Sequence, residues 1–357
     1  MKNSCGSVLT VIMMGHLLQE IAGDCHSRGF IDCKCNFMGA CEAQGLNYKL
    51  TGYSPSGLDK FGSSKNLAYL CEEGAVAILY DCKLKTPLYA ATVMDKKQLN
   101  ARYVRPNSNF RRSSTSLDPK YQQKARDYKY SSKVKICYKK KAVKTDRFVD
   151  RLWFKAKNLI FPPFTKCNQE SQNDKLFASI HRGHLIAAQY GRGKKTRIVA
   201  TFRYTNTVPQ FGSVNSGLWN SKEQALVTWG RNNCANPKDK KENVKMHIIV
   251  GAIPSTFARR SFQPKYYGPL GFSDSQSDDY PINVPTVTWT AACCTFSDKN
   301  DEKIARHTFF AVENIPQAVD NLPTDSEEFF KEYTSQTIVL FPKQPGCKDK
   351  NNYRKLC

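Results

Sequence analysis

The stretch at residues 179–223 decides which fold we expect for the whole chain. It begins Ser-Ile-His-Arg-Gly-His-Leu-Ile-Ala-Ala at residues 179–188, resumes as Tyr-Thr-Asn-Thr-Val-Pro-Gln at 204–210, and ends Asn-Ser-Gly-Leu-Trp-Asn-Ser-Lys-Glu at 215–223. A neutral imidazole is a good general base near neutral pH. Mg²⁺ keeps most of its waters in a protein site and needs only one or two protein oxygens. The stretch therefore holds enough residues for a sparse hydrolytic centre with one metal ion.

The last of these runs contains no proline and predicts a helix over residues 216–229. Asn215, Trp219 and Glu223 are spaced four residues apart and form one slanted stripe along its side. In the functional interpretation, Asn215 offers its amide oxygen to a metal, Trp219 packs the helix, and Glu223 holds a metal-bound water. The alternative is an N-cap Asn, a core Trp and a solvated Glu, and the spacing alone favours this alternative. An isolated Arg-Gly-His is likewise more often structural than catalytic.

The combination of the three runs resembles the DNA/RNA non-specific endonucleases of the ββα-metal (His-Me finger) class. That family carries Asp-Arg-Gly-His-Leu, then Thr/Ser-Asn-x-x-Pro-Gln, and then Asn-x-Gly-x-Trp followed by a Glu. The residues that match, in the same order, are Arg182, Gly183, His184, Leu185, Thr205, Asn206, Pro209, Gln210, Asn215, Gly217, Trp219 and Glu223. Flanking runs at residues 78–81, 87–91, 251–254 and 289–294 are similar to a secreted branch, the endonuclease-domain-containing-1-like proteins. The resemblance covers roughly residues 65–345 and implies a central, mostly antiparallel sheet flanked by helices.

The resemblance also implies roles for individual residues. His184 becomes the general base, and Arg182 becomes a site residue near the phosphate. Asn215 becomes the direct ligand of Mg²⁺, with Mn²⁺ as a substitute, and Glu223 acts on the metal through water. The implied activity is hydrolysis of phosphodiester bonds in DNA and RNA, without selection for the sugar. Two nearby residues are candidates for the family's transition-state-stabilising arginine: Arg203 and Arg231.

One position departs from the family pattern. The acidic residue that precedes Arg-Gly-His in the family is His181 in this chain. An imidazole cannot orient its neighbours or tune the local field as a carboxylate does. The alternative function is therefore a catalytically inactive nuclease-fold protein that binds nucleic acid or other polyanions. Retention of the general base and of both metal-site residues together favours the enzyme.

The charge of the chain favours a polyanionic partner. The formal net charge is +23, from 54 Lys and Arg against 31 Asp and Glu. Nucleic acid is the first candidate, and heparin-like glycans or anionic membranes are the alternatives. Residues 100–147 interleave basic and aromatic side chains, which can contact phosphates and stack on bases, although a solvated loop is the other interpretation. The basic run at residues 191–197 fits a phosphate-contacting loop or an exposed hairpin tip. The candidate nucleic-acid contacts are Arg111, Arg112, Lys194, Lys195 and Arg197.

The cysteines and the N-terminus favour secretion. The chain has 14 Cys without zinc-site spacing, which favours disulfides in an oxidising compartment. Residues 1–23 resemble a signal peptide, with a buried N-terminal helix as the alternative. Its removal takes Cys5 away and leaves 13, so one thiol would be free or paired between chains. We expect adjacent Cys293 and Cys294 to enter different disulfides. No other apolar run approaches transmembrane length, so we expect no stable membrane insertion.

The remaining patterns predict an α+β protein. Strands are expected at residues 75–80 and 87–94, which form a hairpin, and at 197–202, 246–251, 286–294, 308–312 and 337–341. A short acidic helix is expected at residues 326–334, a helix or strand at 151–160, and a long polar loop at 254–281. Strands and helices follow each other without βαβ alternation, which favours the α+β class. We divide the chain into a signal peptide (1–23), a Cys-rich segment (24–64), one nuclease domain (65–345) and a tail (346–357).

Overall fold

The computed structural model describes the sheet, its covering layers and the central motifs. The described residues are 25, 29–62, 64–114, 117–123, 136–139, 175–178, 180–235, 242–254, 282–297, 303–315, 320, 322–347 and 353–356. The proposed signal peptide, the element expected at 151–160 and residues 255–281 of the expected loop lie outside them.

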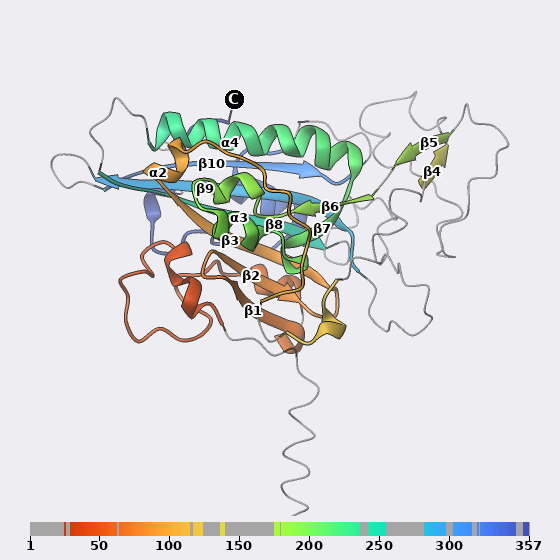
Figure 1. Cartoon of the computed structure of the whole chain (residues 1–357), viewed down its shortest axis with the longest axis horizontal. Coiled ribbons are helices and arrows are strands. Elements are labelled where there is room, and N and C mark those ends of the chain that lie inside the picture. The colour runs from red at the N-terminus through yellow and green to blue at the C-terminus, as the bar shows by residue number, and fades with distance from the viewer. Residues whose placement is uncertain are drawn as a thin grey trace, which may run out of the picture.

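A six-stranded antiparallel sheet forms the centre of the protein (Figure 1). In spatial order its strands are β1 (Leu67–Glu72), β2 (Val76–Asp81), β3 (Thr86–Asp95), β8 (Glu242–Pro254), β9 (Pro285–Ser297) and β10 (Lys303–Glu313). All neighbouring pairs are antiparallel. The strands expected at 75–80, 87–94, 246–251, 286–294 and 308–312 are confirmed, as is the α+β class.

Both faces of this sheet are covered, which explains why a strand such as β2 is apolar at successive positions. In β2 every residue is buried, and successive side chains enter different cores: Ile78 joins one cluster and Leu79 the other. On one face, the N-terminal segment at residues 30–61 and helix α5 (Ser326–Thr334) pack against Trp289 and its neighbours. α5 spans residues 326–334, the range in which the sequence predicts a short acidic helix.

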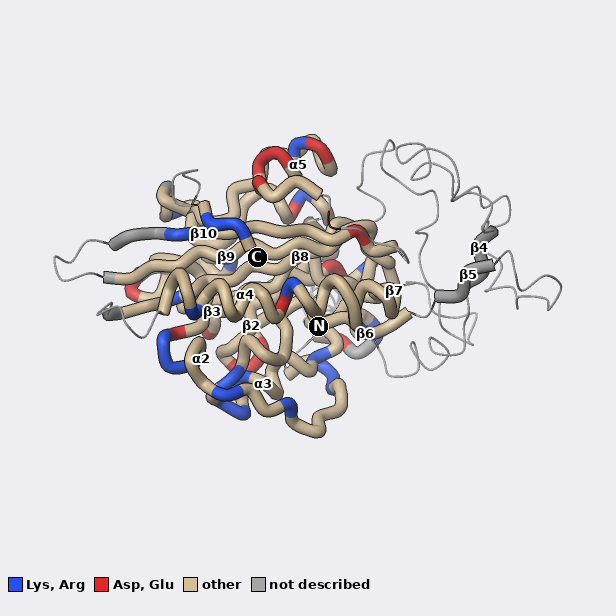
Figure 2. Tube along the Cα trace, turned by 90° about the horizontal axis from the view of Figure 1, so that it is seen from above, with Lys and Arg blue, Asp and Glu red and all other residues tan. Residues whose placement is uncertain are grey.

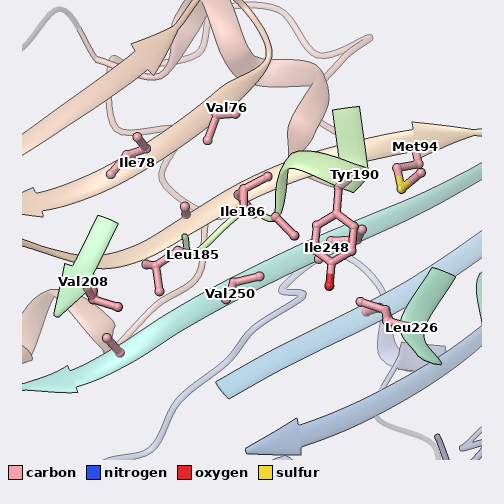
Figure 3. Close-up of a cluster of buried hydrophobic side chains, with 14 of the residues drawn as sticks. Val76, Ile78, Met94, Leu185, Ile186, Tyr190, Val208, Leu226, Ile248 and Val250 are labelled. Atoms are coloured by element: carbon pink, nitrogen blue, oxygen red, sulfur yellow. The ribbon is translucent and has the colours of Figure 1, made fainter. Parts of the chain in front are cut away.

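The other face carries the layer built from the central motifs. It contains β6 (Ile180–His184), α3 (Lys195–Thr201), β7 (Thr207–Phe211) and α4 (Trp219–Asn233). Figure 3 shows Leu185, Ile186 and Tyr190 from this layer packed over Ile248 and Val250 of the sheet. Full burial of an aliphatic side chain of this size stabilises by about 1.5–3 kcal/mol. The residues that follow His184 therefore anchor the motif layer onto the sheet.

Smaller elements complete the described chain. They are α2 (Lys96–Asn100), whose N-terminus is capped by Asp95, and the separate pair β4 (Ile136–Lys139) and β5 (Lys175–Ala178). In the described part of the chain, no helix is long and apolar enough to cross a membrane.

Five disulfides join the described residues. They are Cys25–Cys82, Cys33–Cys71, Cys35–Cys41, Cys234–Cys294 and Cys293–Cys347. The first two tie the N-terminal segment to the sheet. The last two tie α4 and the C-terminal segment to β9. The prediction that Cys293 and Cys294 enter different disulfides is confirmed, and so is the use of cysteine in disulfides.

Two expected strands are wrong. Residues 197–202 lie mostly in α3, because Ile198 and Phe202, four residues apart, share one side and pack with Ala188. Residues 337–341 form no strand of the sheet and make only a single bridge, between Val339 and Ser56. Neighbouring side chains at positions 340 and 341 are both buried there, so the alternation of a half-buried strand is missing.

Candidate active site

The paired strands β6 and β7 bring two of the sequence motifs together. His184 lies opposite Thr207 in the antiparallel register. The Asn206 amide oxygen accepts from the Ile186 N–H at 3.0 Å, and its Nδ2 donates to the carbonyls of Ile186 at 3.0 Å and Thr201 at 2.9 Å. The Thr-Asn motif therefore fixes the backbone directly after the candidate general base.

The glycine between Arg182 and His184 is required by close packing. A Cβ at Gly183 would lie 1.9 Å from Oε1 of Gln210 on the neighbouring strand. Nε2 of Gln210 donates to the Thr288 hydroxyl at 3.2 Å, which joins β7 to β9. The spacing of Arg-Gly-His and Pro-Gln thus reflects one packed arrangement of β6, β7 and the central sheet.

The His184 imidazole lies between aromatic rings. Its centroid is 4.8 Å from that of Phe110 and 4.9 Å from that of Phe202. The residue is half-buried overall, but its Nε2 is fully buried and has no hydrogen-bond partner among the described residues. The pKa of His184 is lowered to about 3, mainly by burial, and the positive charges of Arg105 and Arg182 act in the same direction. The ring is therefore neutral at physiological pH, which is the form a general base requires.

Two arginines flank this imidazole. The Arg182 guanidinium lies 5.0 Å from the centroid of the Phe110 ring and donates to the Tyr204 hydroxyl at 3.5 Å. The Arg105 guanidinium lies 5.9 Å from the centroid of the Phe202 ring. Sequence reasoning placed Arg105 only within a basic stretch with interleaved aromatics and missed it as a site residue. Its side chain reaches the site because residues 101–114 run across the motif layer.

The two arginines considered earlier for the transition state are engaged elsewhere. Arg203 forms an ion pair with Glu73 and donates to the Arg112 carbonyl at 2.8 Å. Arg231 donates from Nε to the Leu99 carbonyl at 2.7 Å. The positive charges that act on the candidate base are those of Arg105 and Arg182 instead.

The predicted helix begins later than expected. α4 starts at Trp219, and residues Val214–Leu218 form a π-helical turn in which Gly217 leaves helical geometry (φ −106°, ψ −110°). Asn215 therefore lies before α4, whereas Trp219 and Glu223 lie on it. Trp219 is buried in the core, as both interpretations of the helix required. Nδ2 of Asn215 is 3.4 Å from Nδ1 of His181, so the residue that replaces the family acid contacts the candidate metal ligand.

The surroundings of Glu223 fit a cation. Burial raises the pKa of its carboxyl to about 8, while Trp219 and the positive charge of Arg105 act in the opposite direction. A bound cation would favour the ionised carboxylate. Within the described residues, no three His, Cys, Asp or Glu side chains converge on one point. The residue types that the sequence assigns to the metal, an amide oxygen from Asn215 and a carboxylate from Glu223, are hard oxygen donors of the kind that Mg²⁺ takes in small number, because that ion keeps its waters.

The candidate nucleic-acid contacts divide into two kinds. Lys194, Lys195, Arg111 and Arg112 are exposed. The Arg197 guanidinium turns inward and donates to the Thr92 hydroxyl at 3.1 Å and to the Val93 carbonyl. Figure 2 shows Lys and Arg gathered over α2 and α3, while Asp and Glu gather on α5. Basic charge therefore concentrates on the side of the protein that carries the motif layer.

Comparisons with known proteins concern the family and the fold. The search of curated proteins finds no match. The structure is similar to a chain in the crystal structure of the EndoG/EndoGI complex, with a TM-score of 0.49 and 13% identity over 84% of this chain and 94% of that chain. The sequence profile of the DNA/RNA non-specific endonucleases matches residues 55–333. Because that match spans most of the chain, the protein belongs to the DNA/RNA non-specific endonuclease family.

Proposed function

We propose that this protein is a secreted, Mg²⁺-dependent endonuclease that hydrolyses internal phosphodiester bonds of DNA and RNA. The observation that carries the proposal is the state of His184. Its imidazole is neutral, its Nε2 has no partner among the described residues, and two arginines lie beside it. Positive charge next to a neutral base favours an anionic substrate and disfavours premature protonation of the base.

In the proposed reaction, His184 accepts a proton from the attacking water. Arg182 and Arg105 neutralise charge that develops on the non-bridging phosphate oxygens. Mg²⁺ held by Asn215, with Glu223 acting through a metal-bound water, would supply electrostatic stabilisation of the leaving oxygen. The exposed basic residues over α2 and α3 load the substrate through its backbone, which carries no base sequence.

Secretion is part of the proposal and rests on two features. Five disulfides staple the described residues, and such bonds persist in oxidising compartments. The first 23 residues have the pattern of a signal peptide. Expression in a secretory host followed by N-terminal sequencing tests this: a mature chain in the medium supports it, and a full-length chain kept in the cytosol contradicts it.

Supercoiled plasmid tests the catalytic proposal. Oxidised wild-type protein should nick and then fragment the plasmid with Mg²⁺ and leave it intact with EDTA. His184→Ala should bind the same DNA in a gel-retardation assay without cutting it. Cleavage by His184→Ala at the wild-type rate would contradict the assignment of the base.

A second function, inactive binding of polyanions, is favoured by one observation. His181 stands where the family has an acid, and its ring contacts Asn215. If this contact disables the centre, the wild type retards DNA without cutting it, and His181→Asp gains Mg²⁺-dependent cleavage. If the wild type cuts and His181→Asp changes its rate only severalfold, the enzyme proposal stands.

A further inference from the structure

Glu72, the last residue of β1, is fully buried although no sequence motif includes it. Its Oε1 accepts hydrogen bonds from the hydroxyls of Thr205, at 2.8 Å, and Ser113. Its Oε2 accepts from Ser114 twice, from the backbone N–H at 2.8 Å and from the hydroxyl at 2.6 Å. The Arg203 Nε lies 3.9 Å from the same oxygen. Burial of a carboxylate is costly unless such donors surround it, so three chain segments are organised around this one residue.

The first route from Glu72 to the candidate base runs through residues 101–114, which we call the strap. Its Arg111 pairs through the backbone with the segment after α3: the Arg111 N–H donates to the Phe202 carbonyl at 2.9 Å, and the Tyr204 N–H donates to the Arg111 carbonyl at 2.9 Å. The preceding residue, Phe110, packs on His184. Ser113 and Ser114 therefore fix the strap a few residues beyond its contact with the base.

The second route runs through the Thr-Asn motif. Thr205 donates to Glu72, and the next residue, Asn206, holds the backbone of Leu185 and Ile186. These two residues follow His184 directly. The Glu72 carboxylate therefore binds both the strap, which packs on His184, and the Thr-Asn motif, which holds the backbone after His184.

We propose that Glu72 is a positioning residue of the active site, which sets the strap, with Arg105 and Phe110, against His184. This inference rests on the proposed nuclease function. A carboxylate suits the task because both of its oxygens only accept, and donors from the strap and from Thr205 converge on it. A glutamine of the same shape keeps only one accepting oxygen. The hydroxyls that face its NH₂ group must then turn round and accept, and the negative charge beside Arg203 is lost.

The experiment compares Glu72→Gln with Asp81→Asn. Asp81, the last residue of β2, is also a buried carboxylate, and it accepts from the Leu84 N–H at 2.9 Å. We measure kcat and KM on a short DNA duplex, together with the NMR shift of the His184 Cε1–H, which the rings of Phe110 and Phe202 displace. Glu72→Gln should lower kcat by about 10- to 100-fold, since small misplacements of catalytic groups have effects of this size. Its KM should stay within about threefold and its His184 resonance should move, whereas Asp81→Asn should change neither kcat nor the resonance.

Other outcomes separate the possibilities. If Glu72→Gln fails to fold, Ser114→Ala is used in its place. This variant removes the hydroxyl bond from Ser114 to Glu72 and keeps the backbone N–H bond, so we expect a smaller shift of the His184 resonance. An unmoved His184 resonance with unchanged kcat in a folded variant overturns the proposal, even if stability falls. If the wild type cuts no DNA, the proposed function fails, and the NMR comparison still decides whether Glu72 places the strap.

Discussion

His184 and His247 are two imidazoles that the protein withdraws from water, in different parts of the molecule. His184 ends β6 in the motif layer, under the strap. His247 lies in β8 within the central sheet, and its Nδ1 is 3.0 Å from the carbonyl oxygen of Asn36 in the N-terminal segment. Burial lowers the pKa of both, to about 3 for His184 and about 4 for His247.

The difference lies in what surrounds each ring. His247 has a backbone partner, which partly opposes the effect of burial on its pKa, and it joins two layers of the fold. His184 keeps a buried nitrogen without a partner among the described residues and has two arginines beside it. Burial and a lowered pKa are therefore common to a structural and a candidate catalytic histidine. The unpaired nitrogen and the adjacent positive charge are what distinguish the second.

The largest expected effect separates the two histidines by activity. His184→Ala should lower the cleavage rate by about 10²- to 10⁴-fold, the usual contribution of a general base, with little loss of thermal stability. His247→Ala should keep the rate within about threefold and lower the Tm, because it removes a buried hydrogen bond and leaves a cavity. Cleavage rates and thermal denaturation of both variants check this. A rate loss in His247→Ala with an unchanged rate in His184→Ala would contradict the assignment of the two roles.

The next effect concerns stability in acid and applies to both residues. Their folded pKa values lie below the ordinary value of 6.5, so the unfolded chain binds protons that the folded chain does not. Their contribution to the free energy of unfolding is complete above pH 6.5 and is lost as the pH falls through 6.5 toward 4. For His247 the pKa of about 4 places this loss between pH 6.5 and 4.

Urea unfolding at pH 7 and pH 4.5, in EDTA, measures this loss. His247→Gln and His184→Gln should each lose less stability than the wild type on acidification, because each lacks one of the two groups. Equal losses in all three proteins would show that neither ring is held neutral by the fold.

A third test concerns the carboxyl of Glu223, whose pKa burial shifts in the direction opposite to that of the two histidines. Its folded pKa of about 8 lies above the ordinary value, so in metal-free protein it stabilises the fold below pH 4.5, and this contribution is lost as the pH rises toward 8. Binding of Mg²⁺ should release a proton at pH 7 and tighten up to about pH 8. Glu223→Gln should weaken Mg²⁺ binding by about 10-fold and abolish the proton release. Calorimetry in buffers of different ionisation enthalpy measures both, and unchanged proton release in the variant would exclude Glu223 from the metal site.

The smallest expected effect separates the exposed side chains of Lys194 and Lys195 from the inward-facing side chain of Arg197. Lys194 and Lys195 should each neutralise one phosphate. Replacement of both by Ala should therefore reduce the slope of the logarithm of the DNA-binding constant against the logarithm of the salt concentration by the share of about two phosphate contacts. Arg197→Ala should leave that slope unchanged and lower the Tm, because its guanidinium bonds to β3. Binding titrations at several salt concentrations, with denaturation curves, check the pair; an equal loss of slope in both variants would contradict the distinction.

The sequence predicted most of the sheet because its signals were local. Apolar runs such as residues 75–80 and 286–294 indicate strands buried on two faces, and the structure places them in the sheet. Residues 197–202 misled the prediction because a short apolar run fits a strand and a helix equally well. Only the four-residue spacing of Ile198 and Phe202, used in packing against Ala188, separates the two.

Site residues that belong to a local sequence motif could be predicted. Site residues that reach the site from distant parts of the chain could not. His184 and the Thr-Asn pair could be found because their spacing is fixed by β6, β7 and the segment with α3 that joins the two strands. Arg105, Phe110 and Glu72 come from the strap and from β1, far away in sequence, and no local pattern marks them. Glu72 in particular looks like an ordinary charged residue at a hairpin end until its donors are seen.

Chemical rescue of His184→Gly tests directly whether His184 is the general base. We expect this variant to fold, to bind DNA and to cut it at least about 100-fold more slowly than the wild type with Mg²⁺ present. Added imidazole should restore cleavage with saturation, because the cavity between Phe110 and Phe202 accepts the missing ring. Cleavage by His184→Gly at the wild-type rate without imidazole would show that His184 is not the general base.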